Sequence, residues 1–208
     1  MNRFYFVVRG LLTGFVRAIF RIEIIGAENE PQTGAHLVCA NHMSLWDPVT
    51  MGACLKKRQV RFMAKAELFK IPLLGGIIRA LGAFPVKRGG SDVRAVKTTI
   101  ELLKNGECVG IFPQGTRRRG IDPCKTEVKG GAGMCAYHSG CDVLPVAIVN
   151  KRRRMIFLQK TFVIIGKPIK YTELPLETNE KPDFKLASKF IFDRVCELSD
   201  KYYPRLPQ

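Results

Sequence analysis

Residues 36–48 read "HLVCANHMSLWDP". The first five of these residues, 36–40, form a short apolar run, which is typical of a buried strand. Asp47 followed by Pro48 indicates the start of a helix, because Asp caps the first turn and Pro suits the first helical position. The stretch therefore predicts a strand, a polar loop and a helix in succession.

The same alternation of short β-branched runs and longer helical segments continues along the chain. Further strands are predicted at 22–26, 59–64, 82–87, 108–112, 143–149 and 161–166, and helices at 48–56, 72–81, 91–105, 129–139 and 183–202. This pattern is typical of an α/β fold, with a largely parallel central sheet flanked by helices. We expect residues 22–208 to form a single domain, preceded by a helical segment at residues 1–21.

The charge of the chain indicates its partners. The 208 residues are 46% hydrophobic, but 34 Lys and Arg against 18 Asp and Glu leave a net charge of +16. Such a charge predicts nucleic acid, an anionic membrane surface or an anionic substrate as a partner. The sequence contains no nucleic-acid fold signature, and charge spread along the chain suits a membrane face equally well.

The seven cysteines show no CxxC pair, and Cys39 and Cys108 lie in apolar runs, so a reducing cytoplasm is expected. Cys135, His138 and Cys141 are spaced like metal ligands. The surrounding "GAGMCAYHSG" reads instead as a helix that ends near Gly140. We therefore expect no metal site there.

Residues 1–21, "MNRFYFVVRGLLTGFVRAIFR", indicate an amphipathic helix. At about 100° per residue, the four Arg share one side of the helix with Thr13 and both Gly, and the opposite side is apolar. Phe6 and Phe20 are exceptions, because they fall on the side of the arginines. The uncharged run at 10–16 is shorter than the roughly 20 residues of a membrane span. We expect a helix in a membrane interface; the alternative is a helix packed on the domain's own core.

Three chemically suggestive loops follow predicted strands, at the strand ends where α/β sheets bind ligands. The first carries His42 and Asp47, and it permits two interpretations. Asp47 can be a helix cap beside a structural histidine. Its carboxylate can also fold back onto the imidazole, fix one tautomer and stabilise the imidazolium formed when the other nitrogen takes a proton. Asp47 can serve both roles, with one oxygen accepting from the helix and the other from His42.

The second and third loops are basic. Lys87 and Arg88 follow the strand at 82–87, and "PQGTRRRG" follows the strand at 108–112. Gly115 allows close backbone approach, and Arg117 presents a planar fork that suits phosphate oxygens. Arg118 and Arg119 fit a solvated basic turn equally well.

The chain resembles the glycerolipid acyltransferase family in four sequence blocks, which occur in the family's order. The blocks are "NHMSLWD", "GAFPVKRGG", "FPQGTR" and "VLPVAI". They are most similar to the bacterial 1-acyl-sn-glycerol-3-phosphate acyltransferases, over residues 22–170. The resemblance implies transfer of an acyl group from acyl-CoA or acyl carrier protein to the free hydroxyl of 1-acyl-sn-glycerol-3-phosphate. The product is phosphatidic acid, an intermediate of phospholipid biosynthesis. No cofactor and no metal are expected.

The resemblance also implies roles for individual residues. It makes His42 the general base and Asp47 its orienting partner. It gives phosphate binding to Arg88, Gly115, Thr116 and Arg117, supporting roles to Asn41, Lys87 and Gln114, and the fourth-block proline to Pro145. The N-terminal segment is expected to dock on an anionic membrane, as a peripheral or monotopic protein on the cytoplasmic face of the cell membrane.

Gln114 departs from the Glu that is usual in the family's third block. If that Glu positions an arginine through a charged pair, Gln114 holds it less tightly, which bears on the acceptor rather than on the reaction type. One alternative is therefore an acyltransferase for a different lysolipid or an amine-bearing lipid. Another is a non-catalytic basic protein that binds a membrane or nucleic acid. Acyl chain length, donor, oxyanion donors and oligomeric state stay open.

Overall fold

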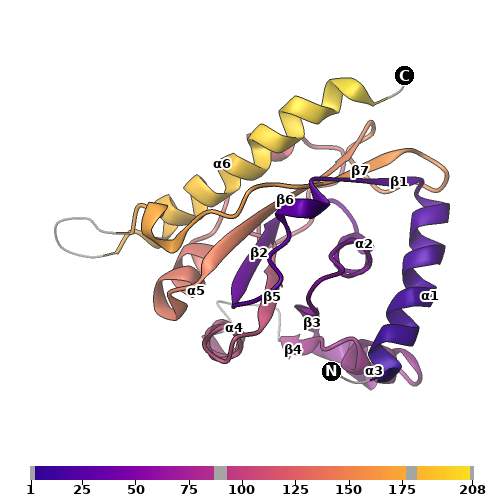
Figure 1. The fold of residues 1–208 in the computed structure, drawn as a ribbon, viewed down its shortest axis with the longest axis horizontal. Helices are drawn as coiled ribbons and strands as arrows, with labels where there is room; N and C mark the ends of the chain where they lie inside the picture. Colours follow the sequence, from indigo (N-terminus) through magenta and orange to yellow (C-terminus); the bar gives the residue numbers. More distant parts are fainter. Residues whose placement is uncertain (1–2, 87–92, 177–181, 207–208) are drawn as a thin grey trace.

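The structure is a computed structural model that describes residues 3–86, 93–176 and 182–206. These residues form a seven-stranded sheet in the order β1-β7-β6-β2-β5-β3-β4 (Figure 1). The strands are β1 (Ile22–Ile25), β2 (His36–Ala40), β3 (Val60–Lys65), β4 (Phe84–Val86), β5 (Cys108–Ile111), β6 (Asp142–Asn150) and β7 (Thr161–Ile165). The helices are α1 (Arg3–Ile19), α2 (Asp47–Cys54), α3 (Leu74–Ala80), α4 (Val93–Lys104), α5 (Gly131–Ser139) and α6 (Phe184–Tyr202). The predicted α/β class is confirmed.

The sheet is parallel except where β6 meets β7. β2 pairs in parallel with both β5 and β6, and β3 pairs in parallel with β4 and β5. β7 runs antiparallel to β6, and β1 is parallel to β7. Five strands therefore run one way, and the two at one edge run the other way.

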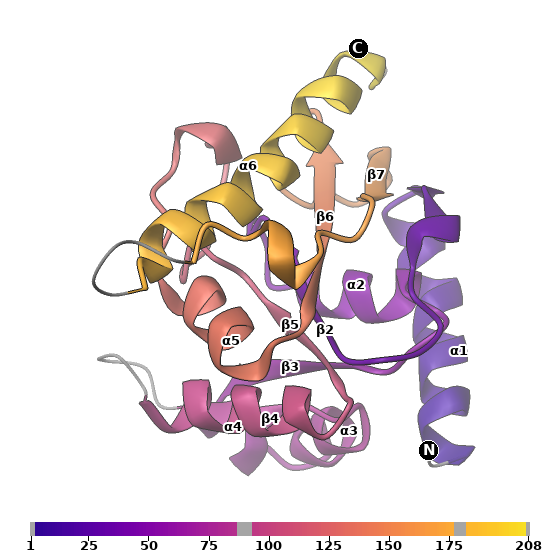
Figure 2. The same ribbon diagram turned by 60° about the vertical axis from the view of Figure 1, so that its left-hand side comes forward.

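Helices cover both faces of the sheet (Figure 2). The side chains of β2 alternate between the two layers, as a period of two requires. Leu37 and Cys39 pack with residues of α4, α5 and α6, whereas Val38 and Ala40 pack with residues of α1 and α2. Since β2 is buried on both sides, its apolar run is continuous, as in central parallel strands generally.

The parallel pairing of β2 and β5 places two of the suggestive loops side by side. Both strands end at the same sheet edge, so the loop before α2 and the loop after β5 meet there. Residues 87–92, including Lys87 and Arg88 of the second loop, lie outside the described residues. The predicted meeting of the first and third loops is confirmed.

The expected end of α5 is also confirmed. The helix stops at Ser139, and Gly140 follows with φ 67°, a left-handed conformation that suits glycine at a helix end. Cys135 and Cys141 are buried in the apolar core between the sheet and α4, α5 and α6. The cysteines around this helix therefore serve the core.

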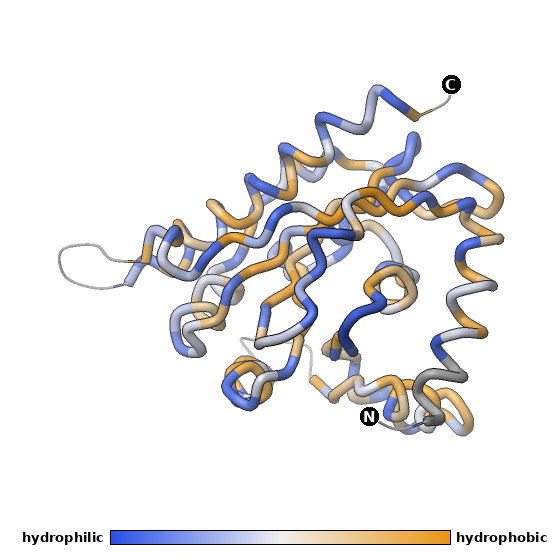
Figure 3. The backbone as a smooth tube through the Cα atoms, viewed as in Figure 1, coloured by the Kyte–Doolittle hydropathy of each residue, from blue (hydrophilic) through white to orange (hydrophobic). Residues whose placement is uncertain are grey.

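Helix α1 turns a mixed face toward the protein and an apolar face outward. Arg9 Nη1 donates to the Lys56 carbonyl at the end of α2 (3.1 Å), while Val16 and Phe20 are buried in the core. Leu11 and Phe15 are 72% and 52% exposed. Phe20, which fell on the wrong side of a two-faced helix, belongs to this inner face. Figure 3 shows apolar and polar residues alternating along the described length of α1.

No helix of the described segments is long and apolar enough to cross a bilayer. The division into residues 1–21 and 22–208 and the membrane docking of α1 stay predictions. The outward apolar face is what the interfacial interpretation expects.

Candidate active site

The loop between β2 and α2 brings His42 and Asp47 into direct contact. His42 Nδ1 lies 2.7 Å from Asp47 Oδ2. The same oxygen accepts the backbone N–H groups of Met43 (2.6 Å) and Ser44 (2.7 Å). The loop therefore wraps around one carboxylate oxygen, as the second interpretation of this motif requires.

Asp47 is not the helix cap that the sequence indicated. It is the first residue of α2, with Trp46 at the capping position, and no capping hydrogen bond is made by the Trp46 side chain. Side chains of helical residues point back toward the N-terminus, so the carboxylate reaches the preceding loop rather than the first turn. The predicted division of its oxygens between helix and histidine is wrong. Oδ2 makes all these bonds, and Oδ1 has no partner among the described residues.

The charge of Asp47 is set by two opposing effects. Burial is the larger effect and raises the pKa of its carboxyl above the ordinary value, while the hydrogen bonds from His42, Ser44 and Met43 offset part of that rise. Three donors converging on one oxygen favour the ionised form. An ionised Asp47 holds the proton of the neutral imidazole on Nδ1, which leaves the lone pair on Nε2.

The imidazole ring is fixed but accessible. It stacks on Phe112 with ring centroids 4.1 Å apart and planes inclined by 16°. The His42 side chain is 11% exposed, whereas that of Asp47 is fully buried. A buried carboxylate behind a partly exposed imidazole is the arrangement of a general base and its orienting group.

The backbone of His42 is held by the third-block loop. Its N–H donates to Gln114 Oε1 (2.7 Å), and its carbonyl accepts the N–H of Arg118 (2.8 Å). Gln114 Nε2 donates to Thr126 Oγ1 (2.6 Å), and that hydroxyl donates to the Pro123 carbonyl (2.6 Å). The two loops are therefore joined by the main chain of the histidine itself.

Gln114 has a different partner from the one expected. Among the residues that the structure describes, its hydrogen bonds go to His42 and Thr126 rather than to an arginine. Thr126, which sequence reasoning missed, supplies the acceptor that the extra Gln N–H groups need. A Thr twelve residues downstream carries no local signal of this role.

We expect Gln114→Leu to lower kcat/KM for acyl transfer by about 10- to 100-fold, because small misplacements of a catalytic group cost rates of this order. The His42 N–H would lose its acceptor, and the loop would shift. Gln114→Glu is the matched control, since it keeps an oxygen for that N–H and should stay near the parent. Steady-state kinetics of both variants check this, and equal activity of Gln114→Leu and the parent would contradict it.

Asn41 ties the loop to the next strand. Its side chain donates to the Ile148 carbonyl (2.9 Å) and accepts the Ile148 N–H (2.8 Å), so it extends the pairing of β2 with β6. Pro145 lies within β6, paired with Cys39 of β2. Both residues thus support the sheet beneath the site.

The Gly-Thr-Arg turn lies beside the catalytic loop. Gly115 has φ 68°, and its N–H closes the turn on the Phe112 carbonyl (2.9 Å). A Cβ at this glycine would lie 2.9 Å from the Lys129 side chain, so a larger residue fits neither the backbone nor the space. Thr116 is exposed and Arg117 is half-buried. Both side chains are accessible to a ligand.

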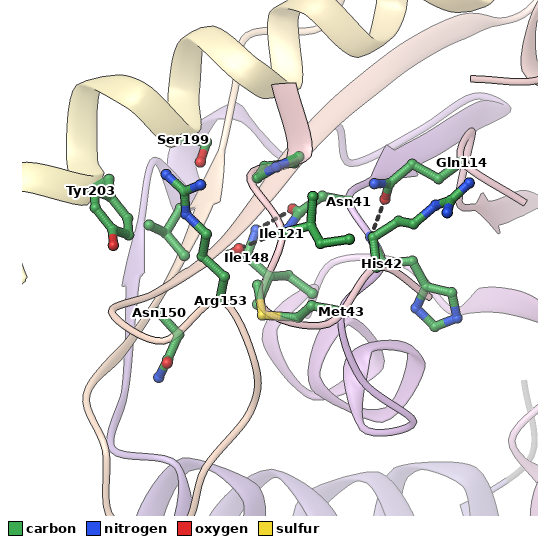
Figure 4. A pocket seen from close by; sticks show the side chains of 13 residues that line it. Asn41, His42, Met43, Gln114, Ile121, Ile148, Asn150, Arg153, Ser199 and Tyr203 are labelled. Atoms are coloured by element: carbon green, nitrogen blue, oxygen red, sulfur yellow. Dashed lines mark hydrogen bonds between the residues drawn. The ribbon is translucent and has the colours of Figure 1, made fainter. Parts of the chain in front are cut away.

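A small cavity lies behind the catalytic loop (Figure 4). Asn41, Gln114, Ile148 and Arg153 are among its lining residues. In Figure 4 the imidazole of His42 points away from Arg153, toward the other side of the loop. His42 also lines this cavity, with its ring on the side away from Arg153.

One cluster of side chains in the described part of the chain has the composition of a metal site, namely Asp122, Cys124 and Asp200. Its bonds are already structural. Asp122 pairs with Arg153 (2.8 Å) and accepts the Cys124 N–H (3.1 Å). These contacts stabilise the turn at Pro123–Lys125, and we propose no metal there.

Together, the α/β sheet and a histidine–aspartate loop joined to a Gly-Thr-Arg turn define the class of this protein as an acyl-transferring enzyme. The profile of the family described as "Acyltransferase" matches residues 21–149. The chain belongs to this acyltransferase family.

Relatives support the resemblance drawn from the motifs. The chain is 30% identical over 185 residues to 1-acyl-sn-glycerol-3-phosphate acyltransferase of Bacillus subtilis, covering 86% of this chain and 89% of the relative. It is 31% identical to the Streptococcus pneumoniae enzyme of the same name, covering 70% of this chain but about half (54%) of that relative. The crystal structure of the LPA acyltransferase PlsC from Thermotoga maritima matches with a TM-score of 0.74 and 26% identity, covering 98% of this chain and 81% of that chain. The resemblance is confirmed.

Proposed function

We propose that this chain transfers a fatty acyl group from acyl-CoA or acyl carrier protein to the free hydroxyl of 1-acyl-sn-glycerol-3-phosphate, forming phosphatidic acid. The named activities of its relatives support this acceptor. The observation that carries the proposal is the 2.7 Å contact between the accessible His42 ring and the buried Asp47 carboxylate.

His42 acts on the acceptor hydroxyl. An alcohol is a poor nucleophile until a base takes its proton, and a positioned base contributes about 10²–10⁴ in rate. Nε2 takes the proton as the hydroxyl oxygen bonds to the thioester carbon, and Asp47 stabilises the resulting imidazolium. The carbon–sulfur bond then breaks, and the proton passes from His42 to the departing thiolate. No covalent acyl-enzyme is needed, and the cofactor-free chemistry uses the donor as co-substrate.

The phosphate of the acceptor is bound by the basic turn. Gly115 brings the backbone close, Thr116 offers a hydroxyl, and the guanidinium of Arg117 suits two phosphate oxygens. Arg88 of the second loop completes the proposed set, and Lys87, its neighbour in the sequence, has a supporting role; both lie outside the described residues. Asn41 and Gln114 hold the catalytic loop through the contacts described above.

We expect Arg117→Ala to raise KM for 1-acyl-sn-glycerol-3-phosphate by about 10- to 100-fold, since a hydrogen bond to a charged group is worth about 1.5–3 kcal/mol. kcat should change little, because the phosphate is bound before and during reaction. Arg119→Ala, in the same turn but exposed, is the matched control. An unchanged acceptor KM for Arg117→Ala would remove Arg117 from this role.

The membrane is the proposed site of action. The outward face of α1, with Leu11 and Phe15, would enter the lipid interface, and the net charge of +16 favours anionic head groups. These features support the proposal of a peripheral or monotopic protein on the cytoplasmic face of the cell membrane.

A panel of lysolipids tests the acceptor. Purified protein is incubated with lysolipids that differ in head group, each with acyl-CoA and with acyl carrier protein, and products are identified by mass spectrometry. Phosphatidic acid should be the main product. Preferred acylation of a lysolipid with a different head group, or of an amine-bearing lipid, would favour the alternative acceptor. It would overturn 1-acyl-sn-glycerol-3-phosphate as the acceptor.

A further inference from the structure

The turn between β6 and β7 combines exposed apolar and basic side chains. Residues 151–160 read "KRRRMIFLQK". Phe157 and Leu158 are 62% and 71% exposed, and Lys151, Arg152 and Arg154 are exposed basic residues of the same turn, with Lys151 over the Tyr203 ring. A single exposed apolar residue is ordinary, but two adjacent large ones flanked by cations form a patch typical of interaction surfaces.

This turn is fixed to the end of α1. The Leu158 N–H donates to the Ile19 carbonyl (2.6 Å), and the Phe157 ring stacks on Phe20 with centroids 5.4 Å apart. In Figure 1 the turn lies beside the C-terminal end of α1. The exposed position of the two side chains is therefore built into the fold.

Leu158 is held in a conformation that leucine disfavours. Its φ is 61°, in the left-handed region where Asn and Gly are more stable than branched residues. Neither backbone preference nor solvent exposure favours leucine at this position. Burial of the Leu158 side chain by a ligand would explain why leucine occupies this position.

The turn continues the outward face of α1. Leu11, Phe15 and Ile19 are spaced four residues apart, so they follow one another along the same face of the helix. Leu11 and Phe15 are exposed, and Ile19 meets the turn at Leu158. Helix and turn together form one apolar edge with basic residues at its border.

The same edge borders the catalytic loop. Phe20, which stacks on Phe157, also contacts Trp46 with centroids 5.5 Å apart. Leu45 beside Trp46 is 62% exposed. The Gly120 N–H donates to the Arg153 carbonyl (2.9 Å), which joins the turn to the phosphate-binding loop. A ligand on this edge would lie next to both parts of the site.

We propose that the β6–β7 turn is a second membrane contact, in which Phe157 and Leu158 enter the lipid interface while Lys151, Arg152 and Arg154 meet anionic head groups. The proposal rests on the proposed function, because it assumes that α1 docks on the bilayer and that the acceptor is a lipid. Because α1 and the turn form one edge that borders the catalytic loop, their two contacts would together hold that loop at head-group level. An acidic carrier protein would need the cations alone, whereas the apolar tip favours a bilayer.

Leu158→Asn gives the sharpest test. The full chain is sedimented with vesicles of phosphatidylcholine, with and without phosphatidylglycerol. Because Asn tolerates the left-handed backbone, the thermal stability of the variant should equal or exceed that of the parent. Vesicle binding of the variant should weaken by about tenfold, because Asn lacks the apolar side chain that enters the lipid. Leu186→Ser, an exposed leucine on α6 away from α1, is the control and should bind as the parent does.

Further variants separate this proposal from the proposed function. Phe157→Ser with Leu158→Ser should weaken binding further, and should lower acylation of vesicle-borne acceptor but not of acceptor dispersed in detergent. Failure of the parent to acylate any lysophosphatidate in detergent would refute the proposed function while leaving the binding result readable. Vesicle binding of both turn variants at the parent's level would overturn the membrane contact. So would loss of carrier-protein binding with intact vesicle binding, which would make the turn a protein site.

Discussion

Replacing His42 by alanine is expected to lower kcat/KM for acyl transfer by about 10²–10⁴-fold, the contribution of a positioned general base. The imidazole is the accessible member of the pair, at 11% exposure, and its Nδ1 is already engaged by Asp47. Removing it takes away the group that accepts the hydroxyl proton. The loop backbone stays in place, because its bonds to Gln114 and Arg118 are made by the main chain of residue 42.

This variant should remain folded. The loss of one hydrogen bond to a charged group costs about 1.5–3 kcal/mol. His138→Ala, at an exposed histidine near the end of α5, is the matched control and should retain full activity. Steady-state kinetics and thermal unfolding are measured together. Activity of His42→Ala within a few-fold of the control would show that the imidazole is not the base.

Replacing Asp47 by alanine should damage both activity and stability. Its Oδ2 is the acceptor of the buried Met43 and Ser44 N–H groups, and each buried group left unpaired costs about 1–3 kcal/mol. We therefore expect about 2–6 kcal/mol of lost stability, reduced by the release of a carboxyl that burial destabilises. The rate should fall because the imidazole loses the group that fixes its tautomer and stabilises its protonated form.

The contrast between the two variants distinguishes the roles of the pair. Asp193→Ala, at an exposed carboxylate on α6, controls for loss of a surface charge. Denaturant unfolding gives the stability change, and kinetics at a temperature where both variants are folded give the rate. An Asp47→Ala protein as stable as the parent would mean that the loop does not depend on this carboxylate.

Much of the fold could be predicted because apolar periodicity is local. The run at 36–40 became β2, and the following Asp-Pro marked the start of α2. The sequence analysis did not predict that β7 runs antiparallel to β6. An apolar run indicates a buried strand but not its direction, which here depends on the turn between the two strands.

The site was harder to predict in its details. Asp47 was predicted both to cap the helix and to contact His42, but a shift of one position makes it the first helical residue, and only the contact with His42 forms. That shift reverses the direction of the carboxylate. The link from Gln114 to Thr126 depends on tertiary contact between residues twelve apart, which no local pattern reports.

Helix α1 shows the same limit. Its periodicity indicated one basic and one apolar face, but the face turned toward the protein is mixed, with Arg9 beside Val16 and Phe20, and Leu11 and Phe15 face outward. A sequence gives the angle of each residue around a helix, whereas only the packing of α2 and the sheet shows which angle points inward.

The central claim is that His42 drives formation of phosphatidic acid. Purified protein and its His42→Ala variant are given 1-acyl-sn-glycerol-3-phosphate with acyl-CoA or acyl carrier protein, and initial phosphatidic acid formation is measured by mass spectrometry. We expect phosphatidic acid from the parent with at least one donor, and a rate lower by about 10²-fold or more from the variant. Equal rates from both proteins, or none from the parent with either donor, would contradict the account.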